Sequence, residues 1–290
     1  MIGDVPYTDA AVTNDFPNLI RELNRASLEF VTHDGDIKAG AAPCTDELFV
    51  ARLAQFQTIR HPLFYVPGDN EWTDCSKMAE HKRDPLEALA KVRELFCAGN
   101  QSLGQRTLPV SRQSDGADAR FATFRENIRW ERGGIMFAGF NVPGAANNYD
   151  QPEFKLRNQA NLAWLRETFA LATQHGSLGV LLVMQANPHY DLGRTNKVRL
   201  GFNEFLDAIE KETVAFGRPV VLVHGDSHYF RIDQPMVSAR SHRRVERFTR
   251  VETFGNPDAH WVRVTVDPQD PNLFRFRPEY VRANFVDHRK

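Results

Sequence analysis

The sequence lacks the features that would place it in several large protein classes. No apolar run approaches the roughly 20 residues of a transmembrane helix, so no membrane segment is predicted. The formal net charge of −1 gives no indication of a nucleic-acid or membrane partner. The basic run at residues 240–244 is too short to change this. Repeats and low-complexity segments are absent, and nothing indicates an oligomeric state.

Cysteine is scarce. The three cysteines form no Cys-x-x-Cys pair, which argues against a structural zinc site. Cys44 and Cys75 flank one predicted helix-strand unit and could form a disulfide in an oxidising compartment. We expect free, buried thiols instead.

A signal peptide is also absent, because a Gly-Asp pair at residues 3–4 stands almost at the start. We expect a cytoplasmic protein on the sequence as given, or an exported one if a leader precedes it. Three later Gly-Asp pairs follow a full strand, whereas only two residues precede the first. We therefore expect that the first strand of the domain lies upstream of residue 1.

The most informative feature is the set of four Gly-Asp pairs, at residues 3–4, 35–36, 68–69 and 225–226. The last three follow apolar runs. Glycine at the end of a buried strand allows a tight turn, and the aspartate then lies beyond the carboxyl end of the strand. Open α/β sheets bind ligands at these ends. Four carboxylates in one crevice repel one another unless a cation lies between them, so the sequence predicts a divalent metal site.

Helical patterns separate these apolar runs. They cover residues 16–27, 45–56, 85–96, 154–174 and 198–216. A hairpin is predicted over 130–142, with its turn at Gly133-Gly134, and a long loop over 99–120. After residue 223 the pattern contains strands only, which suggests a second, mostly antiparallel sheet. The composition, 42% hydrophobic and 25% charged, suits one α/β domain over residues 1–290.

The order of these motifs resembles that of the calcineurin-like metallophosphoesterases over nearly the whole chain. That family carries Asp-x-His, Gly-Asp, Gly-Asn-His-Asp/Glu, a lone His after a strand, and Gly-His-x-His. The matching segments here are Asp4-Val5-Pro6, Gly35-Asp36, Gly68-Asp69-Asn70-Glu71, Gln185 and Gly225-Asp226-Ser227-His228. The resemblance implies a layered α-β-β-α sandwich of two mixed sheets with outer helices. It also implies a metal-dependent hydrolase of phosphate monoesters or diesters.

The sequence departs from the family at several ligand positions. The family histidines are replaced at Pro6, Asn70, Gln185 and Asp226, and Asp69 stands where the family has Asn. By resemblance, one half-site would hold Asp4, Asp36 and His228. The other would hold Asp36, Asp69, Gln185 and Asp226. Because these exchanges remove imidazoles and add oxygen ligands, we expect one or two ions of Mn, Mg or Ca rather than Zn.

The family's leaving-group histidine is replaced by Asn70, whose amide does not titrate near neutral pH. General acid catalysis contributes about 10²–10⁴-fold, so the reaction needs another acid or a good leaving group such as an aryl phosphate. Three histidines on the site-bearing loops are candidate acids: His33, His189 and His224. Of these, we expect His189 to face the crevice.

The expected substrate is a small phosphorylated molecule, with Lys38 and Asn70 as candidate substrate-binding residues. Glu71 is expected to hydrogen-bond within its own loop, and Tyr7 and Trp72 to serve in packing. The alternative function is a catalytically weak or inactive relative that binds a metal ion or an anion. A carbohydrate- or ion-binding module would explain the acidic loops but not the order of the motifs.

Overall fold

The computed structural model describes residues 1–77 and 82–285. Its largest element is a seven-stranded mixed sheet in the order β3-β4-β5-β6-β7-β9-β8. The strands are β3 (Ser111–Arg112), β4 (Ile128–Arg132), β5 (Ile135–Gly139), β6 (Gly179–Val183), β7 (Val220–His224), β8 (Arg231–Asp233) and β9 (Phe248–Glu252). Strands β5, β6, β7 and β9 are parallel, so their carboxyl ends lie at one edge.

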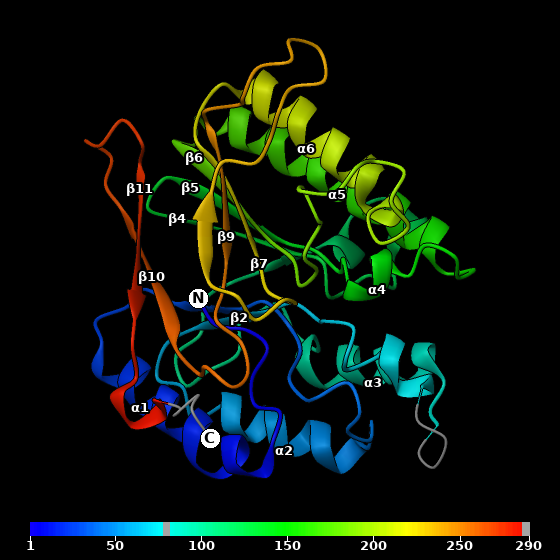
Figure 1. Cartoon of the computed structure of the whole chain (residues 1–290), viewed down its shortest axis with the longest axis vertical. Helices are drawn as coiled ribbons and strands as arrows, with labels where there is room; N and C mark the ends of the chain where they lie inside the picture. Colours follow the sequence, from blue (N-terminus) through cyan, green and yellow to red (C-terminus); the bar gives the residue numbers. More distant parts are fainter. Residues whose placement is uncertain (78–81, 286–290) are drawn as a thin grey trace.

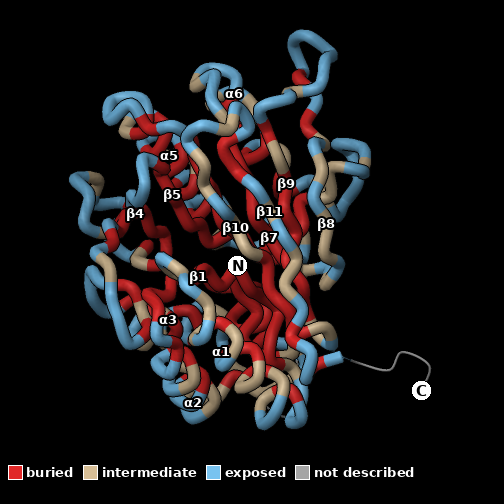
Figure 2. Tube along the Cα trace, turned by 90° about the vertical axis from the view of Figure 1, so that its left-hand side faces the viewer, coloured by how far each residue is buried: buried red, intermediate tan, exposed pale blue. Residues whose placement is uncertain are grey.

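A second layer of strands faces this sheet. Strand β1 (Val31–His33) pairs in parallel with β2 (Leu63–Tyr65), and β10 (Trp261–Val266) pairs antiparallel with β11 (Phe274–Glu279). The N-terminus joins the two pairs, because Ile2 bridges to His33 and Met1 exchanges backbone hydrogen bonds with Val262. Figures 1 and 2 place the N-terminus at the centre of the molecule.

A cavity of about 670 Å³ lies beside Met1, between β1 and β10. Its lining includes Val31, Phe137 and Val264, from both layers of strands. The expectation of a further strand before residue 1 stays a prediction.

Helices cover the outer face of each layer (Figure 1). On the side of β1 and β2 lie α1 (Phe16–Arg25), α2 (Asp46–Phe56) and α3 (Pro85–Phe96). On the seven-stranded sheet lie α5 (Phe154–Gln174) and α6 (Asn203–Phe216). The Thr45 side chain accepts a hydrogen bond from the backbone N–H of Leu48, which caps the start of α2. None of the helices in the described ranges combines the length and apolar character needed to cross a bilayer.

Alternation along the buried strands divides most of the interior of the described residues into three large apolar cores, beside one small cluster around Phe121 and Phe124. In β6, Val180 and Leu182 pack toward α5 and α6, whereas Leu181 and Val183 point into the space between the two sheets. Between the sheets, Phe64 stacks on Trp130 with ring centroids 3.8 Å apart. A third core lies under α1, α2 and α3. Three cores between four layers confirm the predicted α-β-β-α sandwich.

Two expectations about the strands and loops are wrong. Strands β8 and β9 do not form a separate sheet, because β9 pairs in parallel with β7 and β8 pairs with β9 at the edge of the seven-stranded sheet. Strands β10 and β11 make an antiparallel pair outside that sheet, whereas β8 pairs antiparallel with β9 within it. The predicted loop over 99–120 contains β3 and two short 3₁₀ turns, Gln113–Asp115 and Ala119–Phe121.

The expectation of free thiols is also wrong for two of the three cysteines. Cys44 and Cys75 form a disulfide with their Cα atoms 5.6 Å apart, and Cys97 stays free and buried. The disulfide joins the loop after β1 to the loop after β2. These loops carry Asp36 and Asp69.

Candidate metal centre

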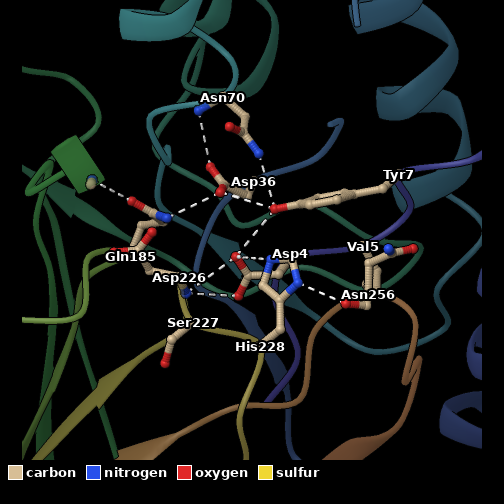
Figure 3. Close-up of polar contacts among 12 residues, drawn as sticks. Asp4, Val5, Tyr7, Asp36, Asn70, Gln185, Asp226, Ser227, His228 and Asn256 are labelled. Carbon is tan, nitrogen blue, oxygen red and sulfur yellow. Dashed lines mark hydrogen bonds and ion pairs between the residues drawn. The ribbon is translucent and has the colours of Figure 1, made fainter. Parts of the chain in front are cut away.

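Loops from both sheets converge at one place (Figure 3). The layer of β1 and β2 contributes Asp4 after the Ile2 bridge, Asp36 after β1 and Asp69 after β2. The seven-stranded sheet contributes Gln185 after β6, Asp226 after β7 and His228 before β8. The structure therefore brings the six predicted metal-ligating residues together from segments far apart in the sequence.

The glycines of the Gly-Asp pairs are needed for close approach. A Cβ atom on Gly68 would lie 2.0 Å from Asp36 Oδ1, and one on Gly225 would lie 2.0 Å from Asp4 Oδ2. Because these glycines have no side chain, an aspartate from another motif can occupy the space beside each of them. In three of the four pairs the aspartate adopts a left-handed backbone conformation, with φ of 50° at Asp4, 58° at Asp36 and 80° at Asp226. Such conformations cost about 1–3 kcal/mol each and cluster at functional sites.

His228 and Asp4 face each other with their hydrogen-bond acceptors. His228 Nδ1 lies 2.7 Å from the carbonyl oxygen of Asn256, which only accepts, so Nδ1 carries the ring hydrogen. In the neutral ring Nε2 is then an acceptor, and it lies 3.6 Å from Asp4 Oδ1. Two acceptors across such a gap favour a cation between them, and a carbonyl partner on the second nitrogen is typical of metal-binding histidines.

Tyr7 lies at the centre of the site, where packing was expected. Its hydroxyl donates to Asp36 Oδ2 at 3.0 Å and lies 3.3 Å from Asp4 Oδ1, while Asn70 Nδ2 donates to the same hydroxyl at 3.0 Å. Burial and the charges of Asp36 and Asp4 raise the pKa of Tyr7 well above its usual value. The signal in the sequence was its place three residues after Asp4. The Tyr7 hydroxyl oxygen is therefore an additional candidate ligand atom beside the first half-site.

The site carboxyls have raised pKa values. Burial, followed by repulsion from neighbouring carboxylates, raises the pKa of Asp4 and Asp36 well above the ordinary value. Burial and the Asp226 charge raise the pKa of Asp69 to about 7, and burial raises the pKa of Asp226. A bound cation would stabilise the ionised form of each group.

The carboxylate oxygens, the imidazole nitrogen and the phenol oxygen of this site are atom types that bind divalent cations. In this structure, hydrogen bonds connect several of these groups to one another. Among residues 1–77 and 82–285, no three His, Cys, Asp or Glu side chains are grouped so as to enclose one ion. Asp4 Oδ1, His228 Nε2 and Asp36 Oδ2 are the atoms best placed to receive one, since Tyr7 already connects the two carboxylates.

Gln185 turns the nitrogen of its amide toward the carboxylates, and its predicted role as a metal ligand stays a prediction. Its Oε1 accepts the backbone N–H of Gly144 at 2.7 Å, and its Nε2 donates to Asp36 Oδ2 at 3.0 Å. The amide therefore turns its donor side toward the centre.

The three candidate acids differ in environment. His33 and His224 are fully buried, and burial lowers the pKa of each to about 3, so both are neutral near pH 7. His33 Nδ1 accepts the N–H of Gly35, and His224 Nδ1 donates to the Gly225 carbonyl, so both hold backbone turns. His189 is partly exposed, and its charge acts on Asp226. Only His189 among the three keeps access to solvent.

The candidate substrate-binding residues, Lys38 and Asn70, are both engaged in hydrogen bonds to site-bearing loops. The Lys38 ammonium is buried and donates to the carbonyl oxygens of Ala39 and Ala42, which is not the open position expected for a substrate ligand. Asn70 Nδ2 donates to Tyr7 and to the Lys38 carbonyl. Glu71 accepts from the N–H of Gly68 within its own loop, as predicted, and also from the N–H of Asp36, so it links two loops.

Comparison with known proteins gives one result for the fold. No protein-family model matches the chain, and no curated protein matches it. A solved structure of PhoD is similar, with a TM-score of 0.56 over 89% of this chain at 12% sequence identity. The chain covers 56% of the length of that PhoD chain. At this identity the likeness shows a shared fold.

Proposed function

We propose that this chain is a metal-dependent hydrolase of phosphate esters with an oxygen-rich centre. The observation that carries the proposal is the pair of acceptors, His228 Nε2 and Asp4 Oδ1, that face each other over 3.6 Å at the strand ends. The fold likeness to PhoD, a metallophosphoesterase, supports the same reaction class. The motif order supports a distant place in the calcineurin-like family.

The first half-site would hold the ion with Asp4, Asp36 and His228, and Tyr7 lies within reach. Carboxylate and phenol oxygens with a single imidazole suit Mn, Mg or Ca better than Zn. When bound, a divalent ion supplies a Lewis acid for the phosphoryl oxygen and lowers the pKa of water.

Proton delivery is the chemical step in which this chain departs most from the family. Asn70 holds Tyr7 and the Lys38 carbonyl, and its amide has no proton to give near neutral pH. His189 is the candidate acid, because His33 and His224 are buried and neutral. Without an effective acid, a substrate with a good leaving group is favoured.

The test is hydrolysis of a nitrophenyl phosphomonoester and phosphodiester, and of the matching alkyl esters, with added Mn, Mg, Ca or Zn. We expect turnover with the first three ions and faster turnover of aryl than of alkyl esters. Asp36→Ala should remove the activity, whereas Asp118→Ala, at an exposed Arg120 ion pair, should retain it. No ion binding and no turnover under any condition would defeat the proposal.

The alternative is a catalytically weak relative that binds an ion or an anion. The observation in its favour is that Asn70 stands in place of a titratable donor. Ion binding without turnover of any of these esters would support it.

A further inference from the structure

We infer that the centre binds one divalent ion rather than a pair, because Gln185 turns the NH₂ of its amide, and not the oxygen, toward Asp36 in the second half-site. This inference rests on the proposed metal-dependent function. It concerns the second half-site, to which the sequence assigned Asp36, Asp69, Gln185 and Asp226.

The orientation of the Gln185 amide is fixed by its partners. The Gly144 N–H can only donate, so the atom 2.7 Å from it must be the amide oxygen. The NH₂ group then points at Asp36 Oδ2, 3.0 Å away. Turning the amide over would place two donors against each other at Gly144 and two acceptors against each other at Asp36. Gln185 therefore cannot direct an oxygen toward an ion while it keeps these two contacts.

The Asp36 carboxylate, which would bridge two ions, already accepts hydrogen bonds at both of its oxygens. Asp36 Oδ2 accepts from both Tyr7 and Gln185, and Oδ1 accepts the N–H of Asn70 at 3.1 Å. On the side of the first half-site, Asp36 Oδ2 accepts from the Tyr7 hydroxyl, and Asp4 Oδ1 accepts from the backbone N–H of Asp226 at 3.2 Å. An ion in the second would have to displace the Gln185 NH₂ (Figure 3).

Gly144 is itself held in place. It begins a turn in which residues 145–148 all have left-handed backbone, with φ between 48° and 58°. The buried Arg157 guanidinium fixes this turn by donating to Asn147 O at 2.8 Å and to Asn147 Oδ1 at 2.6 Å. Glu153 pairs with the same guanidinium at 2.8 Å. The Gly144 donor cannot turn away without breaking this network.

The same turn fills the space beside the remaining carboxylates. A Cβ atom on Gly144 would lie 2.6 Å from Asp69 Oδ2 and 3.0 Å from Asp226 Oδ1. Asp226 Oδ2 also accepts the N–H of Asn187 at 2.9 Å. Protein atoms, rather than open space, therefore adjoin both carboxylates of the second half-site.

The test is titration of the intact metal-free protein with Mn²⁺, followed by calorimetry and electron paramagnetic resonance. We expect one equivalent per chain and the hyperfine pattern of an isolated ion. Gln185→Glu keeps the size of the side chain and the acceptor for Gly144, but replaces the NH₂ with an oxygen. This variant should bind a second equivalent and show spin coupling between the two ions. Gln174→Glu, an exposed position at the end of α5, is the matched control and should behave like the wild type.

The outcomes separate this inference from the proposed function. Two coupled ions in the wild-type protein would overturn the single-ion centre and leave a metal-dependent hydrolase in place. Absence of Mn²⁺ binding in the wild-type protein would overturn both. If Gln185→Glu fails to fold, the wild-type stoichiometry still decides.

Discussion

Single residues decide how closely the site-bearing loops approach one another. Gly225 lies against Asp4, and an alanine there would place its methyl group 2.0 Å from Asp4 Oδ2. We predict that Gly225→Ala displaces Asp4, lowers the free energy of unfolding by about 1–3 kcal/mol and weakens ion binding. Urea denaturation and Mn²⁺ titration measure the two effects. Gly193→Ala is the control, because a Cβ there meets nothing within 4 Å; equal behaviour of the two variants would contradict the prediction.

Asp69 links the stability of the metal-free protein to pH. Its folded-state pKa is about 7, above the ordinary value of 3.8, so protonation favours the folded state. The stabilisation is full below the unfolded-state pKa and is lost as pH rises through the folded-state value. We predict a loss of up to about 4 kcal/mol between about pH 4 and pH 8 in the presence of a chelator.

Urea denaturation across that pH range tests this prediction. Asp69→Asn cannot ionise, so it should reduce the pH dependence, while Asp4, Asp36 and Asp226, whose pKa values are also raised, still contribute to it. The same slope in the wild type and in Asp69→Asn would show that Asp69 is not its source.

The sequence could predict which side chains meet at the strand ends, but it could not predict their orientations. Asp4, Asp36 and His228 follow from motif order and strand ends. The direction of the Gln185 amide depends on the N–H of Gly144, 41 residues away and in an unusual left-handed turn that local preferences do not reveal. The central place of Tyr7 likewise depends on Asp36, 29 residues distant. Donor geometry of this kind arises only when the loops have packed.

At the scale of elements, the disulfide Cys44–Cys75 connects the loops after β1 and β2, which carry Asp36 and Asp69. It closes a segment with a sequence separation of 31, for which loop entropy gives about 3–4 kcal/mol of stabilisation. We predict that reduction lowers the unfolding free energy by this amount and weakens ion binding. Denaturation and Mn²⁺ titration with and without reductant measure both changes.

The double variant Cys44→Ser/Cys75→Ser provides the control for this experiment. It should match the reduced wild-type protein and show no response to reductant. A response of the double variant would assign the effect to another group, such as Cys97.

Helices and buried strands were predicted well, because apolar periodicity and caps such as Thr45 are local signals. The sheet to which a strand belongs is a non-local property. Strand β9 pairs antiparallel with β8 but in parallel with β7, and no local pattern in its five residues specifies the second partner. The disulfide was missed for the same reason, since it requires two loops from neighbouring strands to meet.

At the scale of the whole molecule, the four layers were predicted from strand-helix alternation and the family resemblance, and three separate cores support them. The first two residues hold a central place in this arrangement. Met1 and Ile2 connect β10 to β1, and Asp4 follows directly. Packing of the N-terminus therefore determines the position of the first predicted ligand.

The candidate centre spans the seam between the two sheets. Asp4 and Asp36 come from one layer, and His228 comes from the other. An ion bound by all three would therefore connect the two halves of the sandwich. Opening the seam would release the ion, and the free energy of binding would add to that of folding. The affinity of this protein for its ion would thus depend on the free energy that holds the two halves together.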